Sequence, residues 1–228
     1  MASILVTDPA GSMPGTGVGA SRGAERRDHG GLRVIADDDS IDVDAAETAI
    51  RDLILALGRD PDSGTMCGTP QRAAKAFREL LTSESFELTT FPNDEHYDEL
   101  VLVRDIPFSS LCEHHLLPFH GVAHVGYLPA ERIVGLSKLA RVVKFFAADF
   151  QTQERLTVQV ADWIDDHLQP EFVGVVVEAD HECMTVRGVR VDGARTFTSA
   201  LRGILRDDAC FRQEFFALAG GGIPGGRT

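Results

Sequence analysis

The apolar positions between residues 40 and 81 recur at the spacing of two amphipathic helices. In the first helix, which we expect to run from Ser40 as its N-cap to just before Gly58, they are Ile50, Leu53, Ile54 and Leu57. Their i, i+3, i+4, i+7 spacing predicts one buried face. Thr69 followed by Pro70 is a second helix start, with proline at the first helical position. The apolar side of this second helix consists of Ala73, Phe77, Leu80 and Leu81.

Extended and helical patterns alternate in the rest of the chain. Runs rich in β-branched and aromatic residues predict strands at Leu100–Phe108, Gly121–Leu128, Phe172–Ala179 and Met184–Val191. The last two are expected to pair through a turn at Asp180–Cys183. Two apolar stripes predict helices between the strand pairs, one of Leu139, Val142, Val143 and Phe146, the other of Leu156, Val160, Trp163, Ile164 and Leu168. With short helices near Ser199–Leu205 and Asp208–Ala217, this order predicts an α+β fold with antiparallel pairing.

The two ends of the chain lack such patterns. Residues 1–38 are rich in Gly, Ser, Pro and charged residues, and we expect them to be disordered because they cannot bury enough apolar surface to offset the entropy of ordering. Residues 220–228 are expected to form a flexible tail. The folded unit is then residues 39–219, with a helical part over about 39–98 and a sheet-forming part over about 99–219.

Composition narrows the class of partner. The formal net charge of −13 argues against nonspecific nucleic-acid binding, which needs a basic surface. No run approaches the roughly 18 to 20 apolar residues of a membrane span, and Met1–Val6 lacks the basic start of a secretory signal. We therefore expect a cytoplasmic protein with no membrane partner, whose 4 cysteines are thiols or metal ligands and not a disulfide framework.

The cysteines and histidines contain a candidate zinc site. Two residues separate Cys112 from His115, so one turn can present a thiolate and an imidazole, the donors that Zn(II) favours. Cys183 is the candidate third ligand, which leaves the fourth tetrahedral position open as in catalytic sites; from the spacing alone, a closed structural zinc site is the main alternative. His114 and His181 favour catalysis, because imidazoles can move protons around a metal-bound water. The other cysteines and histidines considered have the ordinary interpretation of buried or surface residues: Cys67, Cys210, His96, His120 and His124.

A candidate phosphate site begins at Gly135. Ser137 can cap the following helix, and Lys138 and Arg141 lie three apart in its opening turns. The local sequence alone favours the simpler alternative, a capped amphipathic helix whose cations are only solvated.

Other charged residues are ambiguous in the same way. Arg72 and Lys75 share one helix face. Glu154 has the ordinary interpretation of a dipole partner in a first helical turn, and Arg187 that of a surface strand residue. None of these residues identifies a ligand by itself.

Four segments together resemble a known enzyme family. In chain order they are Ser110–Phe119, Gly135–Val143, Gln153–Thr157 and His181–Gly188. They are similar to the signature segments of GTP cyclohydrolase I, and the resemblance extends from about Ser40 to Leu218. Several motifs in the same order and at consistent separations are far more specific than one Cys-x-x-His spacing.

The resemblance implies a tunnelling fold, in which an antiparallel sheet with flanking helices joins the sheets of other subunits in a barrel. It also implies a toroidal homodecamer with active sites at the subunit junctions. The implied reaction converts GTP and water to 7,8-dihydroneopterin triphosphate and formate, the first step toward tetrahydrofolate and other pterins. In that reaction zinc hydroxide attacks C8 of guanine and histidines transfer protons, after which the ribose opens, rearranges and closes on the freed amine.

The resemblance also implies residue roles by position. The implied zinc ligands are Cys112, His115 and Cys183. The implied catalytic residues are Glu113, His114, Ser137 and His181, of which Ser137 and His181 would lie near the ribose hydroxyls. Glu154, with Gln153, would read the guanine. The other implied substrate contacts are Arg72, Lys75, Leu136, Lys138, Arg141 and Arg187, with Arg72 and Lys75 supplied by a neighbouring subunit.

Three other functions compete with this hypothesis. A non-catalytic paralog would bind zinc, and GTP as well, without releasing formate. A zinc-dependent base deaminase also activates water, but the chain lacks its His-x-Glu and Pro-Cys-x-x-Cys pair. A related tunnelling-fold enzyme would act on other pterin or deazapurine substrates, and the Cys112, His115, Cys183 set fits it less well.

Overall fold

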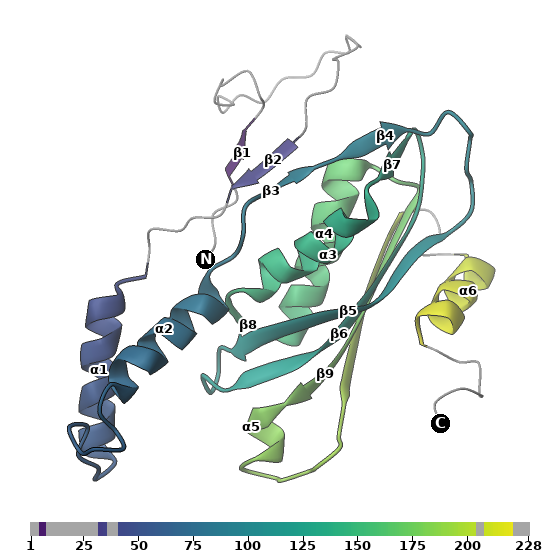
Figure 1. The fold of residues 1–228 in the computed structure, drawn as a ribbon. Coiled ribbons are helices and arrows are strands. Elements are labelled where there is room, and N and C mark those ends of the chain that lie inside the picture. Colours follow the sequence, from purple (N-terminus) through teal and green to yellow (C-terminus); the bar gives the residue numbers. More distant parts are fainter. Residues whose placement is uncertain (1–4, 8–31, 36–40, 204–207, 221–228) are drawn as a thin grey trace, which may run out of the picture.

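A computed structural model describes residues 5–7, 32–35, 41–203 and 208–220 of the chain (Figure 1). Its centre is a five-stranded sheet in the order β10-β9-β6-β5-β8. The strands are β5 (Val101–Cys112), β6 (Pro118–Leu128), β8 (Phe150–Gln151), β9 (Phe172–His181) and β10 (Thr196–Gly203). All neighbours pair antiparallel except β8, which joins the end of β5 in parallel. The structure is thus α+β, as predicted.

Helices cover both faces of this sheet. Helices α3 (Leu136–Ala147) and α4 (Gln153–Leu168) lie on one face, and α6 (Ala209–Ala219) lies on the other (Figure 1). The larger core cluster lies between the sheet and α3 and α4, where both predicted apolar stripes are fully buried. Phe215 of α6 packs over two glycines, because a Cβ at Gly174 would lie 2.6 Å from its ring and one at Gly126 would lie 3.0 Å away. The sheet therefore has a core on each face.

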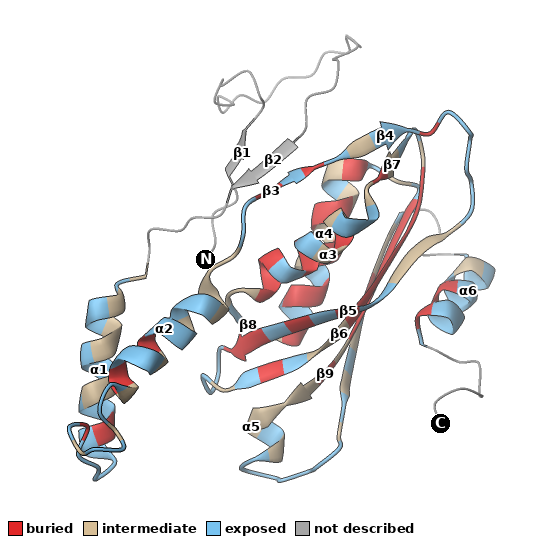
Figure 2. Cartoon of the chain, in the orientation of Figure 1, coloured by how far each residue is buried: buried red, intermediate tan, exposed pale blue. Residues whose placement is uncertain are grey.

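The N-terminal helices form a hairpin beside this body. Helices α1 (Val43–Ala56) and α2 (Thr69–Leu81) pack on each other, and α2 also contacts β5. Most of the hairpin's residues are exposed or half-buried, in contrast to α3 and α4 (Figure 2). No helix in the described ranges has both the length and the apolar character needed to cross a membrane.

Two small sheets complete the described structure. One joins β1 (Leu5–Thr7), β2 (Leu32–Ile35) and β3 (Phe86–Leu88), and the other pairs β4 (Thr90–Pro92) with β7 (Arg132–Val134). Strands β1 and β2 fall inside the segment of residues 1–38 predicted to be disordered, and that prediction stays a prediction. The rest of residues 1–38 lies outside the described ranges. The part of the predicted tail after Gly220 lies outside them too.

The helix starts differ from the predictions in detail. Ser40 lies outside the described residues, and Asp42 caps α1 by accepting a hydrogen bond from the Ala45 amide (2.9 Å). In α2, Gly68 takes the N-cap position with a φ of 74°, so Thr69 is the first helical residue and not the cap. Gly68 makes no side-chain cap hydrogen bond, and a glycine adopts this left-handed conformation without the strain of a Cβ.

The last sheet segment contradicts two predictions. Met184–Val191 is not a strand, because α5 (Glu182–Thr185) follows β9 at once and Gly188 and Arg190 both have positive φ, which ends any extended run. The predicted helix near Ser199–Leu205 is wrong over its described residues. These belong to β10, whose eight residues pair with β9 along their full length. The predicted C-terminal helix is confirmed as α6.

Candidate metal centre and substrate site

The turn between β5 and β6 carries the first two candidate ligands. Cys112 is the last residue of β5, and its amide donates to the Leu117 carbonyl (2.9 Å) across the turn. The amides of His115 and Leu116 both donate back to the Cys112 carbonyl, and Leu116 has a φ of 55°. This tight turn brings Cys112 Sγ to 3.7 Å from His115 Nδ1.

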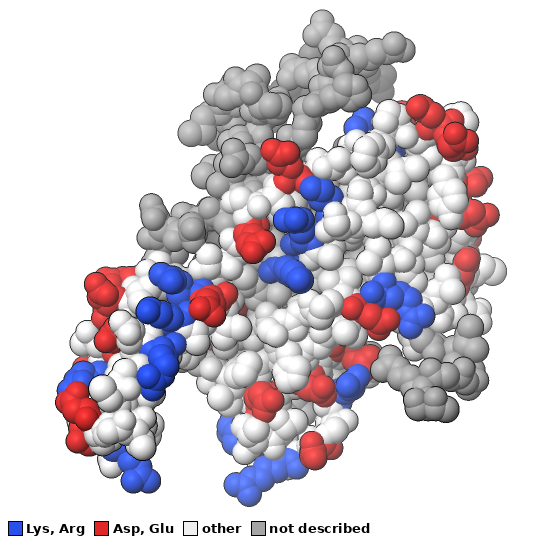
Figure 3. Space-filling view, viewed as in Figure 1, with Lys and Arg blue, Asp and Glu red and all other residues white. Residues whose placement is uncertain are grey.

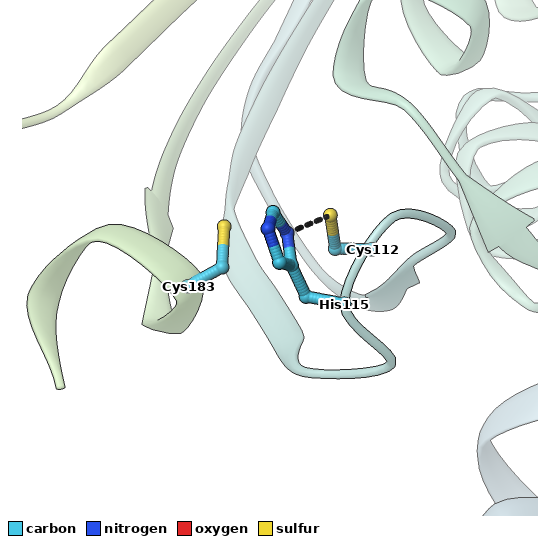
Figure 4. Close-up of side chains that lie close together, drawn as sticks. All are labelled: Cys112, His115 and Cys183. Atoms are coloured by element: carbon cyan, nitrogen blue, oxygen red, sulfur yellow. Dashed lines mark hydrogen bonds between the residues drawn. The ribbon is translucent and has the colours of Figure 1, made fainter. Parts of the chain in front are cut away.

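Sheet topology brings the third ligand to the same place. In the β6–β9 pair Phe119 lies opposite His181, so the end of β9 lies beside the β5–β6 turn. Helix α5 begins directly after His181 and carries Cys183 toward the other two side chains (Figure 4). The ligand atoms of Cys112, His115 and Cys183 all lie within 4.8 Å of one another.

These atoms have the spacing that a zinc ion needs. With Zn–S bonds of about 2.3 Å and Zn–N bonds of about 2.1 Å, tetrahedral angles place sulfur and nitrogen ligands about 3.6 Å apart. The Cys112 Sγ to His115 Nδ1 distance of 3.7 Å matches this value without rearrangement. Two sulfurs and one imidazole nitrogen are also the donors that Zn(II) prefers over the harder divalent cations. The residues present fit zinc.

The protein alone disfavours the charged form of the Cys183 thiol. Burial raises the pKa of Cys183, and the neighbouring Cys112 raises it further, while Arg187 acts in the opposite direction. A divalent cation bound between the two sulfurs would reverse this balance, because coordination stabilises thiolates. The influence of Arg187 on this pKa places its guanidinium close to Cys183.

His181 lies at the edge of this centre with its ring held in place. The ring stacks on Phe119 with a centroid distance of 4.7 Å and parallel planes. Its Nε2 atom lies 2.8 Å from Gln153 Oε1. Burial lowers the pKa of His181, and the carboxylates of Glu154 and Asp180 oppose that shift. His181 and Glu154 are thus electrostatic neighbours.

The side chain of Gln153 is already engaged inside the protein. It is 1% exposed, and its amide nitrogen donates to the carbonyls of Val177 (3.0 Å) and Thr196 (2.9 Å). Its oxygen is the atom that faces His181. Both amide protons of this side chain are used within the chain, so its nitrogen has none left for a ligand, and the expectation that Gln153 helps Glu154 to read the guanine stays a prediction. Glu154, the next residue, is exposed.

Arg155, which the sequence did not indicate as a site residue, contacts Glu113, and Glu113 in turn lies near His114. Arg155, at the start of α4, forms an ion pair with Glu113 (2.7 Å), donates through Nε to Gln151 (2.8 Å) and also reaches the Phe150 carbonyl. The other Glu113 oxygen lies 3.6 Å from His114 Nε2. The His114 side chain is 64% exposed and so is free to meet a ligand.

Apart from Arg187, which lies close to Cys183, the predicted phosphate contacts are not gathered around the metal centre within one chain. Gly135 is the N-cap of α3 and makes no side-chain cap bond, so Ser137 is a first-turn residue and not the cap. Ser137 and Leu136 are exposed at this helix start, and Lys138 is half-buried. Arg141 lines a cavity of about 480 Å³ between α2, β5 and α3, whose lining residues include none of the three metal ligands.

The two candidate cations of α2 form no hydrogen bond or ion pair with the metal ligands among the described residues. Arg72 donates to the Cys67 carbonyl (3.2 Å) and to Thr69 Oγ1 (2.8 Å) within its own helix start, and Lys75 is exposed. Basic side chains gather over α2 and over α3, with acidic side chains between them (Figure 3). One chain therefore assembles the metal centre with Arg187 close to it, and leaves the cations of α2 and α3 apart.

Comparison with known proteins gives one consistent family. A family model for GTP cyclohydrolase I matches residues 46–220. A GTP cyclohydrolase 1 of Mycobacterium ulcerans is 51% identical over 185 residues, covering 78% of this chain and 91% of the relative. A GTP cyclohydrolase 1 of Thermoanaerobacter pseudethanolicus is 49% identical over 183 residues, covering 78% of this chain and 97% of the relative.

A solved structure shares a weaker likeness. The crystal structure of the archaeosine synthase QueF-Like in the apo form is similar with a TM-score of 0.37 and 18% identity, covering 46% of this chain and 94% of that one. At this level the likeness carries no argument about function.

Proposed function

We propose, because the chain belongs to the GTP cyclohydrolase I family, that it converts GTP and water to 7,8-dihydroneopterin triphosphate and formate with the help of zinc. The observation that carries the proposal is the convergence of Cys112, His115 and Cys183 from two distant segments at a spacing that fits this ion. Bound zinc would lower the pKa of a coordinated water from about 16 toward 7 and so supply a nucleophile at neutral pH.

The chain's own side chains would supply the proton transfers. His114 is exposed beside the ligand turn, where its imidazole can deliver a proton to the five-membered ring of guanine. Glu113 would hold His114 from behind, since its carboxylate lies between that imidazole and the Arg155 guanidinium. His181 would serve the ribose steps together with Ser137, which need acid and base groups near the sugar.

Substrate recognition would divide between one carboxylate and several cations. Glu154 is exposed next to His181, and its carboxylate can accept hydrogen bonds from the guanine N1–H and exocyclic amine. The triphosphate would be bound by Arg72, Lys75, Lys138, Arg141 and Arg187. Because the cations of α2 and α3 lie apart from the metal centre and Arg187 in one chain, we propose that neighbouring subunits bring them together.

The proposed assembly is a toroidal homodecamer with active sites at its subunit junctions. Two features of the described residues support self-association. Strand β10 pairs only with β9, and β5 is paired with β8 over Leu111–Cys112 alone, so both sides of the main sheet offer free backbone groups to another strand. Leucines of α1 are also exposed, as discussed below.

The test is to incubate the purified, zinc-replete protein with GTP and to follow formate and dihydropterin absorbance together. We expect both products from the wild type and a loss of both rates of about a hundredfold or more in His114→Ala. Absence of both products from a wild-type protein that retains its zinc and its oligomeric mass would instead support a non-catalytic paralog.

A further inference from the structure

The buried amide of Gln153 has one orientation that satisfies its surroundings. Its nitrogen lies 3.0 Å from the Val177 carbonyl oxygen and 2.9 Å from the Thr196 carbonyl oxygen. Both of these oxygens are acceptors, so each takes one of the two amide protons. The reverse orientation would place the amide oxygen against these two carbonyl oxygens, with no proton between them, around a side chain that is 1% exposed.

This orientation determines which nitrogen of His181 carries a proton. The Gln153 oxygen has only lone pairs to offer, and it lies 2.8 Å from His181 Nε2. The bond therefore requires a proton on Nε2. In the neutral imidazole the free lone pair is then on Nδ1, which has no hydrogen-bond partner among the residues that the structure describes.

Packing fixes the ring in the same position. Phe119 stacks on the His181 ring with parallel planes, which limits rotation of the ring out of the Gln153 bond. Gln153 itself is anchored to β9 through Val177 and to β10 through Thr196, so it ties the first residue of α4 to two paired strands. Adjacent helical residues do not share a face, which is why Glu154 points outward while Gln153 points into the sheet.

We propose that Gln153 is a positioning residue that holds the His181 ring as the Nε2–H tautomer and leaves the lone pair of Nδ1 for the substrate, and that guanine recognition belongs to Glu154 without the Gln153 side chain. This proposal rests on the proposed function, because it assigns His181 a role in the GTP reaction. The Gln153 proposal adds one measurable statement to the proposed function: the Gln153 side chain affects turnover and not GTP affinity.

The kinetic test is Gln153→Leu, a substitution that keeps the apolar stem and removes all three amide bonds. We expect kcat for dihydropterin formation to fall between about tenfold and a thousandfold, as losses of acid–base catalysis and of the correct tautomer do elsewhere, while KM for GTP changes by less than about threefold. A rise in KM of about tenfold or more with kcat preserved would overturn the proposal, because that is the result for a guanine-contacting side chain.

A double-substitution cycle separates positioning from general structural damage. In a His181→Ala background, Gln153→Leu should change kcat by less than about threefold, since the histidine that it positions is gone. Equal fold-losses in both backgrounds would contradict the proposal. The matched control is Thr157→Val, which removes a hydroxyl in the same buried layer, bonded to the Gln153 carbonyl (2.7 Å) and to Thr198 (2.6 Å), without touching His181. Its kcat loss should be less than about threefold.

A spectroscopic measurement on the wild type covers the case in which Gln153→Leu does not fold. Nitrogen-15 spectra of the histidine-labelled, zinc-loaded protein, with the His181 signals assigned by their loss in His181→Ala, should show the proton on Nε2. A proton on Nδ1 in the neutral ring would overturn the proposal even if the enzyme is fully active. A wild type without GTP turnover but with Nε2–H would instead contradict the proposed function alone.

Discussion

Helices α4 and α1 carry apolar stripes of similar spacing, and only α4 buries its stripe within the chain. All five predicted stripe residues of α4 are buried against the sheet and α3. In α1 only Ile54 is buried, whereas Leu53 is 56% exposed and Leu57 is 70% exposed. The difference arises because α4 lies on the sheet, while α1 packs mainly on α2.

The comparison teaches what a hydrophobic period can predict. Regular spacing indicates that one face of a helix needs to be covered, and it carries no information about which surface covers it. For α4 the cover is the chain's own sheet. For α1 the exposed leucines fit a contact with a second subunit, which agrees with the proposed assembly.

The largest effect is expected from truncating the covered stripe. Leu156 is 0% exposed, and Leu156→Ala should lower the free energy of unfolding by about 2 to 5 kcal/mol through lost burial and a residual cavity. Denaturant unfolding followed by fluorescence would measure this. A loss below about 1 kcal/mol would mean that α4 is not the packed helix described above.

A smaller effect, a loss of folding stability at low pH, is expected from His124 of β6. Burial lowers the pKa of His124, with Asp105 and Glu178 opposing the shift and Arg104 adding to it. The Asp105 amide donates to His124 Nδ1 (3.2 Å), a bond that protonation of this atom would remove. Because the unfolded chain then binds the proton more readily than the folded one, stability should fall as pH drops below about 6.5.

His124→Gln keeps an acceptor at this position and removes the titration. Unfolding midpoints measured between about pH 7 and pH 5 should therefore decline less steeply in the variant than in the wild type. Identical slopes for the two proteins would show that His124 does not contribute to acid sensitivity.

The smallest effect on chain stability is expected from the uncovered stripe. Leu57→Ala is the same substitution as Leu156→Ala, yet it should change the free energy of unfolding of the isolated chain by less than about 0.5 kcal/mol, because the side chain is already in water. If another subunit covers α1, the variant should instead lower the oligomeric mass at micromolar concentration in sedimentation experiments. If the oligomeric mass of the variant is the same as that of the wild type at every dilution, α1 does not contribute to the subunit interface.

Much of the body of the fold could be predicted from local patterns. The stripes of α3 and α4 and strands β5, β6 and β9 were visible because their apolar period matches a surface that the chain itself supplies. The β10 residues were misread as a helix because their strand character depends on pairing with β9, a contact that no local window contains.

The metal centre and its neighbours show the same limit. Cys112 and His115 could be paired from their spacing, because one turn holds both. Cys183 joins them through the β6–β9 register, and the internal role of Gln153 follows from carbonyls on β9 and β10. Such long-range partners are fixed by the topology of the sheet. In the sequence, a polar residue at a helix start therefore has the same local pattern whether its side chain contacts a ligand or a strand.

The most direct test of the account measures zinc content and formate release together in Cys183→Ala. Cys210→Ala is the matched control, since Cys210 is an exposed thiol on α6 outside the candidate centre. We predict that the wild type and Cys210→Ala retain stoichiometric zinc and release formate from GTP, and that Cys183→Ala loses both. Full zinc content or undiminished formate release in Cys183→Ala would contradict the assignment of Cys112, His115 and Cys183 as the centre of the reaction.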